Sequence, residues 1–350
     1  MKKRLSPDVF RLPVDEIRQG FYSDAYFLRT AEILNQDHHH PTVMMQVFQR
    51  KEAVLCGIDE AIAILKSCAV APEKLTIKAL FDGDEISPWE TVMTIEGDLA
   101  NFSHLETVYL GSLARQTKIA TNVRRAVQAA GDKPVMFFSA RYDHYAVQRE
   151  DGYAAKIGGI SGVSTDANGD IFNGIGMGTI PHALIAAYNG NTVKATQAFD
   201  SYIDPTMNRV ALIDFDNDCV NTALAVARAL GDKLWAVRLD TSNNMVDKSL
   251  HSRMGMFPPT GVCQELVKLV REGLDAEGFS KVKIMVSGGF NPEKISTFEK
   301  HHVPVDIYAV GSSFMTGSFD FTADIVQVDH KLCSKVGRVY CPNDRLTLVE

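Results

Sequence analysis

The sequence predicts an α/β protein in which a small mixed domain precedes a run of parallel β-α units. In the second half of the chain, short apolar strands alternate with helices, which is typical of parallel sheets. Each of these strands ends in polar residues or glycine, as in barrels whose site lies at the carboxyl ends of the strands. The first hundred residues mix short helices and strands, and Gly/Asp turns at 82–84 and 97–98 fit a small α+β domain.

Two elements of the first part can be placed from their patterns. Residues 89–96 partly alternate polar and apolar side chains, which indicates a half-buried strand. The run from Ser103 to Glu106 has the spacing of a capping box, so we expect a helix that begins there and continues to about Lys118.

The second part is more regular and gives a longer set of elements. Asn291 followed by Pro292 predicts a helix start, with asparagine as the N-cap and proline in the first turn. We expect strands over 209–214, 234–240, 282–287 and 305–310, and further helices over about 219–230 and 261–277.

The ends of these strands carry groups that suit phosphate chemistry. Asp214 and Asp216 follow the first strand, and the second ends on Arg238 and Asp240. The third and fourth are followed by glycine/serine turns, Ser287-Gly288-Gly289 and Gly311-Ser312-Ser313. In β-α barrels a phosphate often binds after the last two strands, so these two turns predict a phosphate site.

One glycine-rich stretch, residues 176–184, combines three informative features. Its glycines permit close backbone approach to a ligand, and Thr179 before Ile-Pro is typical of a helix start with Thr179 at or near the N-cap. His182 would then lie in the first turn, where free N–H groups and positive potential attract anions. The simpler interpretation is a glycine loop entering a helix with a solvated histidine.

Composition restricts the class of protein. The 350 residues are 45% hydrophobic, enough for two domains, and a net charge of −7 argues against non-specific nucleic-acid binding. The six cysteines form no CxxC pair, which favours reduced thiols and gives no zinc signal. With no run of 18 apolar residues and no apolar segment after the basic N-terminus, we expect a cytoplasmic protein that does not bind membranes.

Several motifs together resemble nicotinate phosphoribosyltransferases, especially the shorter archaeal-type members. The resemblance runs from about residue 20 to 330, with the motifs in the family's order. These motifs are Ser23–Tyr26, Glu106-Thr107 through Ala114–Gln116, Gly158-Gly159, Gly178–His182, Val237–Asp240, Val286–Gly289 and Val310–Ser312.

The resemblance implies the type II phosphoribosyltransferase fold, an open α/β sandwich joined to an irregular, incomplete α/β barrel. The sandwich would span residues 1–115, with 325–350 packing on it, and the barrel 116–324. The implied reaction joins nicotinate to phosphoribosyl pyrophosphate, giving nicotinate mononucleotide and pyrophosphate for NAD biosynthesis, usually coupled to ATP hydrolysis. Mg²⁺ would accompany the pyrophosphate, and members form homodimers or higher assemblies in which a neighbouring subunit completes each site.

The resemblance also assigns roles to residues at the matched positions. Nicotinate would be bound by Arg238 and Arg141, which can pair with its carboxylate, by Tyr26, which would stack on the ring, and by Thr179. Each of these residue types is also common as an ordinary surface or core side chain.

The resemblance also assigns residues to catalysis and to phosphate binding. Asp240 would stabilise charge on the ribose, although an aspartate at a strand end can also cap the next turn. His182 matches the histidine that ATP phosphorylates in the family. The 5-phosphate would lie in the turns of Ser287, Gly288, Gly289, Gly311 and Ser312.

The sequence departs from the family's usual motifs at two places, and it leaves several alternative functions open. Tyr142 stands where many relatives carry a second arginine, and Thr241–Asn244 replaces a small acidic turn. Cys333 and Cys341 lack the cysteine pairs of a zinc knuckle, so we predict no structural zinc. Alternatives are a quinolinate phosphoribosyltransferase, which needs more basic groups around the ring, an enzyme that prefers nicotinamide, a non-catalytic homologue, and an unrelated phosphate-binding barrel.

Overall fold

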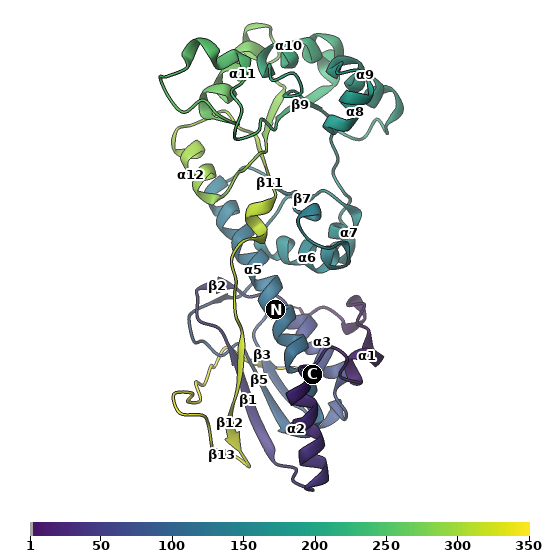
Figure 1. Ribbon diagram of the computed structural model, residues 1–350, viewed down its shortest axis with the longest axis vertical. Coiled ribbons are helices and arrows are strands. Elements are labelled where there is room, and N and C mark those ends of the chain that lie inside the picture. The colour runs from purple at the N-terminus through teal and green to yellow at the C-terminus, as the bar shows by residue number, and fades with distance from the viewer. Residues whose placement is uncertain (1–2) are drawn as a thin grey trace. The chain divides into compact units, whose positions relative to one another are not determined.

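The computed structural model describes residues 3–350, which form two compact units. The first unit contains the residues up to Arg124 together with Tyr153–Gly158 and Thr316–Glu350. The second contains Arg125–Gly152 and Gly159–Met315. The chain therefore enters the second unit, returns briefly to the first, and ends in the first (Figure 1).

The first unit is built on an antiparallel sheet with the strand order β13-β12-β1-β5-β3-β14. Three of its strands come from the end of the chain: β12 pairs with β1, placing Ala323 opposite Val47, β13 pairs with β12, and β14 pairs with β3 (Figure 1). A two-stranded sheet, β2-β4, accompanies it. The strands are β1 Thr42–Phe48, β2 Ala53–Val54, β3 Thr76–Ala79, β4 Glu85–Ile86, β5 Met93–Asp98, β12 Thr322–Val328, β13 Lys331–Leu332 and β14 Thr347–Leu348.

Helices pack on this sheet over one apolar core. Met93 and Ile95 of β5 are fully buried, as are Ile58 and Leu65 of α3, and all four belong to the same cluster. Removal of this apolar surface from water is the main stabilising contribution to such a layer. The helices are α1 Val14–Arg18, α2 Ala25–Gln36, α3 Ile58–Cys68, α4 Leu99–Phe102 and α5 Glu106–Ala130.

The long helix α5 corrects one expectation. Ser103 lies in a short 3₁₀ turn, Ser103–Leu105, and α5 runs from Glu106 to Ala130 rather than ending near Lys118. The helix continues because no proline or glycine interrupts residues 112–130. It ends where Gly131 adopts φ +61°, a left-handed conformation that suits the residue after a helix.

The second unit is a parallel sheet with the order β7-β6-β11-β10-β9-β8. Every pairing in it is parallel, and no pairing within residues 3–350 joins β7 to β8, so the barrel is incomplete. Five of its strands contribute to one buried cluster, which contains Met136, Val210, Ala236, Met285 and Ile307. The strands are β6 Val135–Phe137, β7 Gly162–Val163, β8 Arg209–Leu212, β9 Leu234–Leu239, β10 Lys283–Val286 and β11 Ile307–Val310.

Helices connect these strands in the order expected from the sequence. The helix at 219–230 has the expected bounds, and Asn291 caps α12 by accepting from the N–H of Lys294. These helices are α6 Gln148–Gly158, α7 Asp166–Gly169, α8 His182–Ala187, α9 Thr192–Tyr202, α10 Cys219–Leu230, α11 Gln264–Ala276 and α12 Pro292–Lys300.

The start of α8 corrects a second expectation. Pro181, not Thr179, occupies the N-cap position, and His182 is the first helical residue. Thr179 lies three residues before the first helical residue, too early to cap it, and its hydroxyl accepts a hydrogen bond from Arg238. The α/β class with a sandwich and an incomplete barrel is confirmed. None of the helices described for residues 3–350 has the length and apolar character that a membrane span requires.

Candidate active site

A pocket of about 470 Å³ lies at the carboxyl ends of the parallel strands. All of its lining residues belong to the second unit. Parallel strands all end at the same edge of a sheet, so residues far apart in the sequence meet there. The lining includes Phe138 and Arg141 after β6, Ser164 after β7, Leu212 of β8, Arg238 and Asp240 from β9, Ser287–Phe290 after β10, Gly311 and Ser312 after β11, and Met177–His182.

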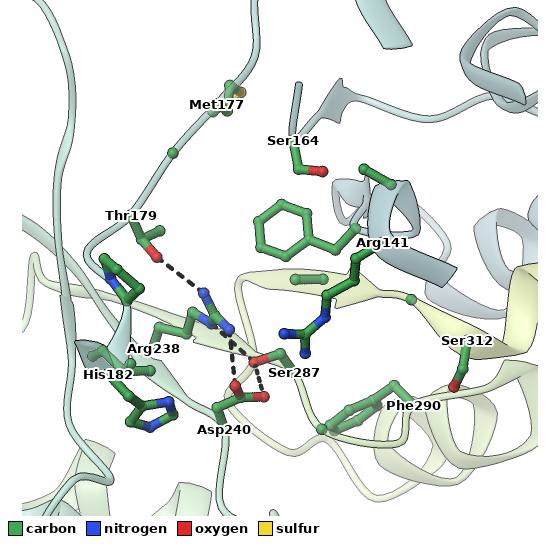
Figure 2. Close-up of a pocket in the computed structure, with 18 of the residues that line it drawn as sticks. Arg141, Ser164, Met177, Thr179, His182, Arg238, Asp240, Ser287, Phe290 and Ser312 are labelled. Atoms are coloured by element: carbon green, nitrogen blue, oxygen red, sulfur yellow. Dashed lines mark hydrogen bonds and ion pairs between the residues drawn. The ribbon is translucent and has the colours of Figure 1, made fainter. Parts of the chain in front are cut away.

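Arg238 is the most connected side chain of the pocket. Its Nη1 donates to the hydroxyl of Thr179 at 2.9 Å, and its Nη2 lies 2.9 Å from Oδ2 of Asp240 (Figure 2). Its Nε donates to the hydroxyl of Ser287 at 3.0 Å. The guanidinium also lies over the ring of Phe138, 5.5 Å from the centroid. Three of its five N–H groups are therefore engaged, and one remains on each terminal nitrogen.

Asp240 is held from two directions. Besides the ion pair with Arg238, its Oδ1 accepts from the hydroxyl of Ser287 at 2.7 Å. Ser287 is buried, and its own N–H donates to the carbonyl of Leu239. The polar groups of Ser287 are thus engaged within the protein, and the residue holds Asp240 and Arg238 together.

Arg141 differs from Arg238 because its guanidinium makes no hydrogen bond or ion pair within residues 3–350. It follows β6 in a short 3₁₀ turn, Ala140–Tyr142, and its only described contact is with the ring of Tyr142, 5.8 Å from the centroid. Figure 2 shows the guanidinium directed into the pocket. A planar, unpaired guanidinium in a concave site is suited to bind a carboxylate or phosphate in two parallel hydrogen bonds.

The two glycine turns lie side by side at the ends of β10 and β11. The hydroxyl of Ser313 donates to the carbonyl of Phe290 and links them. Gly288 and Gly289 adopt φ +83° and +71°, and a Cβ on Gly311 would lie 2.7 Å from the ring of Tyr142. Among the described residues, the N–H groups of Gly288, Gly289, Gly311 and Ser312 donate to no protein acceptor. Unpaired N–H groups in such turns can bind an anion.

His182 is paired with a carboxylate that the sequence marked as a strand-end residue without a role. Its Nε2 lies 3.0 Å from Oδ1 of Asp214, which follows β8. The imidazole is about half exposed, whereas the Asp214 side chain is only 7% exposed. An ionised carboxylate only accepts hydrogen bonds, so Nε2 carries the proton, and in the neutral imidazole Nδ1 keeps its lone pair.

The environment of Asp214 opposes its ionisation. Burial raises its pKa, and the negative charge of Asp240 adds to this, whereas His182 lowers it. The hydrogen bond from His182 therefore helps to keep a charged carboxylate in a largely buried position.

Tyr26 stands apart from the other residues assigned from the sequence. It lies on α2 in the first unit, where its side chain is 58% exposed and its hydroxyl is 3.5 Å from Oδ2 of Asp24. No residue of that unit lines the pocket described here. Ring stacking by Tyr26 stays a prediction.

Three residues at the pocket had no role predicted from the sequence. Asp214, Ser164 and Phe138 line or support the pocket, and each lies at or directly after the end of a parallel strand. Their position was a usable signal, since chemistry in such sheets gathers at strand ends. Residues 3–350 contain no group of three or more His, Cys, Asp or Glu side chains placed to hold a metal ion.

Comparison with known proteins identifies the family. The family model described as "Quinolinate phosphoribosyl transferase, N-terminal domain" matches residues 24–117. The model described as "Quinolinate phosphoribosyl transferase, C-terminal domain" matches residues 119–324. The chain belongs to the quinolinate phosphoribosyl transferase family.

Members of this family with solved structures share the fold. The crystal structure of a nicotinate-nucleotide pyrophosphorylase from Pyrococcus furiosus is 34% identical, with a TM-score of 0.82, covering 99% of this chain and 86% of that one. This likeness confirms the type II phosphoribosyltransferase fold.

Related sequences carry two kinds of name. A nicotinate phosphoribosyltransferase of Mycobacterium tuberculosis is 30% identical over 250 residues, which are 70% of this chain and 51% of the relative. A probable nicotinate-nucleotide pyrophosphorylase [carboxylating] of Methanothermobacter thermautotrophicus is 23% identical over 87% of this chain and 95% of that one. The chain thus spans about half the length of the M. tuberculosis relative.

Proposed function

We propose that this protein is a nicotinate phosphoribosyltransferase, which joins nicotinate to phosphoribosyl pyrophosphate. The observation that carries the proposal is the pocket at the strand ends, where one unpaired arginine faces two glycine turns with unpaired N–H groups. Membership of a phosphoribosyl transferase family agrees with it. The arginine suits the acid and the turns suit the 5-phosphate of the ribose.

The choice of nicotinate over quinolinate rests on the positive charges available. Among the described lining residues only Arg141 and Arg238 carry a permanent positive charge. Arg238 is already engaged with Asp240, Thr179 and Ser287, so one guanidinium is fully available. One carboxylate, as in nicotinate, matches one free guanidinium, whereas a dicarboxylate would require a second.

The chemical step that we propose needs no nucleophile from the protein. The lone pair of the pyridine nitrogen forms a bond to C1 of the ribose while the bond from C1 to the pyrophosphate oxygen breaks. Positive charge develops on the ribose, and the carboxylate of Asp240, fixed by Arg238 and Ser287, would stabilise it. The rest of the rate acceleration would come from positioning the two reactants next to each other.

We propose that Mg²⁺ arrives with the pyrophosphate rather than in a site of the protein's own. Mg²⁺ is commonly bound through substrate phosphates with only one or two protein carboxylates. The described residues offer no cluster for a resident ion, which agrees with a substrate-borne metal. When bound, Mg²⁺ would supply positive charge to the leaving group.

ATP coupling through His182 is the second part of the proposal. Nδ1 of His182 would attack the γ-phosphorus of ATP, and the bond to the oxygen of ADP would break. The proton on Nε2 would stay hydrogen-bonded to Asp214, whose charge stabilises the imidazole as it becomes positive. Water would later attack the phosphorus, giving inorganic phosphate and restoring His182.

A quinolinate phosphoribosyltransferase is the second candidate. The names of the matching family models and of the M. thermautotrophicus relative favour it. In that reaction the 2-carboxylate leaves as carbon dioxide after the bond to ribose forms. Arg141 would then share its substrate with Arg238, which would have to give up contacts within the pocket.

One experiment separates these functions. The purified protein is incubated with phosphoribosyl pyrophosphate and Mg²⁺ and with either nicotinate, nicotinamide or quinolinate, each with and without ATP. Products are measured by chromatography with mass detection. Nicotinate mononucleotide from nicotinate, made faster with ATP, supports the proposal. Product from quinolinate alone supports the second candidate, and absence of product from every acceptor indicates a non-catalytic homologue.

A further inference from the structure

The four-residue segment 179–182 connects the residue that contacts Arg238 to the residue that contacts Asp214. At one end, the hydroxyl of Thr179 accepts from Nη1 of Arg238 at 2.9 Å. At the other end, His182 pairs with Asp214 at 3.0 Å. Figure 2 shows both side chains on the same stretch of backbone, with Thr179 bound to Arg238. A change at His182 therefore has a short path to Arg238, along the backbone to Thr179 and then through one hydrogen bond.

The segment between these residues is stiff. Ile180 is only 2% exposed and packs in a cluster with Ile185 and with Leu212 of β8. Pro181 follows it, and the proline ring restricts the backbone further. Well-packed apolar side chains do not deform continuously, so a displacement of one end is passed on to the other.

The backbone on the far side of Thr179 is free to follow such a displacement. A Cβ placed on Gly178 would meet nothing within 4 Å. Glycine has the widest backbone freedom of any residue, and here it also has empty space around it. When His182 moves and displaces Thr179, the flexible backbone at Gly178 can therefore accommodate the displacement.

We propose that Thr179 is a positioning residue that couples the phosphorylation state of His182 to the position of the Arg238 side chain. This inference rests on the proposed ATP coupling. In the unphosphorylated protein Thr179 holds Nη1 of Arg238. Phosphorylation of Nδ1 adds a group with a charge of about −1.5 to −2 to the first residue of α8, and accommodating its bulk and charge displaces the backbone at His182. The stiff segment carries Thr179 away from Arg238, which then turns Nη1 to the carboxylate of the acceptor while Nη2 keeps its contact with Asp240.

The inference makes a specific claim about affinity. Arg238 binds the acceptor weakly while Thr179 holds it and more strongly once released, so ATP raises kcat/KM for nicotinate mainly through KM. Typical coupling between two sites corresponds to a factor of roughly 5 to 150. Since the link is one hydrogen bond to a charged group, its removal should abolish most of this factor.

The test compares Thr179→Val, which removes the hydroxyl but keeps the shape, with Thr179→Ser, which keeps the hydroxyl. For each variant and the natural protein, KM for nicotinate and kcat are measured with and without ATP. Phosphorylation of His182 is followed separately by intact-protein mass. Thr179→Val should lower the ATP-free KM for nicotinate towards the value with ATP, so that the ratio falls towards one, while phosphorylation persists. Thr179→Ser should restore the ratio.

Each other result overturns the inference. An unchanged ATP ratio in Thr179→Val, an inactive Thr179→Val protein, loss of its phosphorylation, or failure of Thr179→Ser to restore the ratio would each show that Thr179 is not the link. If the natural protein makes product from nicotinate with no ATP effect, the coupling fails while the transferase activity stands. If it makes no product from nicotinate, the proposed function itself fails.

Discussion

The Nε2 of His182 lies 3.0 Å from Oδ1 of Asp214, and this contact fixes the tautomer of the neutral imidazole. Asp214 follows β8 and is nearly buried, whereas His182 is about half exposed at the start of α8. In the neutral imidazole, a carboxylate that accepts from Nε2 leaves the lone pair on Nδ1, which can then act as a nucleophile.

Replacement of Asp214 by asparagine should slow phosphorylation of His182. The amide can still accept from Nε2 but carries no charge to stabilise the imidazolium. Loss of a hydrogen bond to a charged group costs about 1.5–3 kcal/mol, a factor of about 10 to 150 in rate. Phosphohistidine formed from ATP is measured by mass over time.

The matched control for that experiment is Asp216→Asn, two residues further along the same loop. Asp216 is exposed and does not line the pocket. If both substitutions slow phosphorylation equally, the loss reflects the net charge of the loop, and the pairing with His182 is not responsible.

Arg141→Leu should weaken binding of nicotinate more than binding of phosphoribosyl pyrophosphate. Arg141 makes no hydrogen bond or ion pair among residues 3–350, so its removal leaves no buried partner unpaired. Loss of a charge-assisted pair with the carboxylate should raise KM for nicotinate about 10- to 150-fold. Arg141→Lys should recover only part of this, because an ammonium cannot form the two parallel bonds. A rise confined to KM for phosphoribosyl pyrophosphate would instead make Arg141 a phosphate contact.

Much of the second unit follows from local sequence patterns. The helix at 219–230, the cap at Asn291 and the strands at 234–239 and 307–310 were visible because apolar runs, capping residues and turn glycines act over a few residues. The strand ends then located the pocket, because parallel strands share one edge.

Long-range pairing was much harder to predict. Nothing in the sequence near β1 indicates that Val47 lies opposite Ala323, which is more than 270 positions away in the chain. The same limit explains Thr179 and Ser287. Their hydroxyls looked free to contact substrate, but Arg238 and Asp240 engage them, and only the folded sheet brings these four residues together.

Gly289→Ala should raise KM for phosphoribosyl pyrophosphate. Gly289 has φ +71°, and a Cβ there would lie 2.5 Å from Nδ2 of Asn243, so the Asn243 side chain or the turn itself must shift. Displacement of one N–H from the phosphate should cost at least about tenfold in KM. Gly278→Ala is the control, since Gly278 has φ +82° with open space around it and lies outside the pocket. Both variants place alanine at a positive φ and share a backbone strain of about 1–2 kcal/mol. An equal change in KM in the two variants would mean that this strain, and not the loss of an N–H contact to the phosphate, causes the effect.

The stability of the first unit should fall as pH rises from about 4 to 7. Burial and the neighbouring carboxylate of Asp59 raise the pKa of Asp82 to about 7. Asp82 accepts from the N–H of Ile58 and from the hydroxyl of Tyr153. Burial also raises the pKa of Glu106 to about 7, with contributions from Asp324 and Asp24.

The sign follows from where the proton is bound. An unfolded carboxyl group has a pKa of about 4, so between about pH 4 and 7 the folded chain keeps a proton that the unfolded chain has lost. The free energy of unfolding therefore decreases with rising pH in this window, by about 1 kcal/mol per pH unit for each group, and levels off above pH 7. Thermal denaturation between pH 5 and 8 measures this slope as a fall in Tm.

Asp82→Asn should flatten the slope, because the amide carries no charge at any of these pH values and can still accept from Ile58 or Tyr153. The residual slope then belongs to Glu106, and Glu106→Gln should remove a similar share. Asp37→Asn serves as the control, since Asp37 is an exposed carboxyl at the end of α2 and its loss changes net charge equally. A slope that is as steep in Asp82→Asn as in Asp37→Asn would mean that Asp82 is ionised in the folded protein throughout, and that its contact with Tyr153 does not depend on a bound proton.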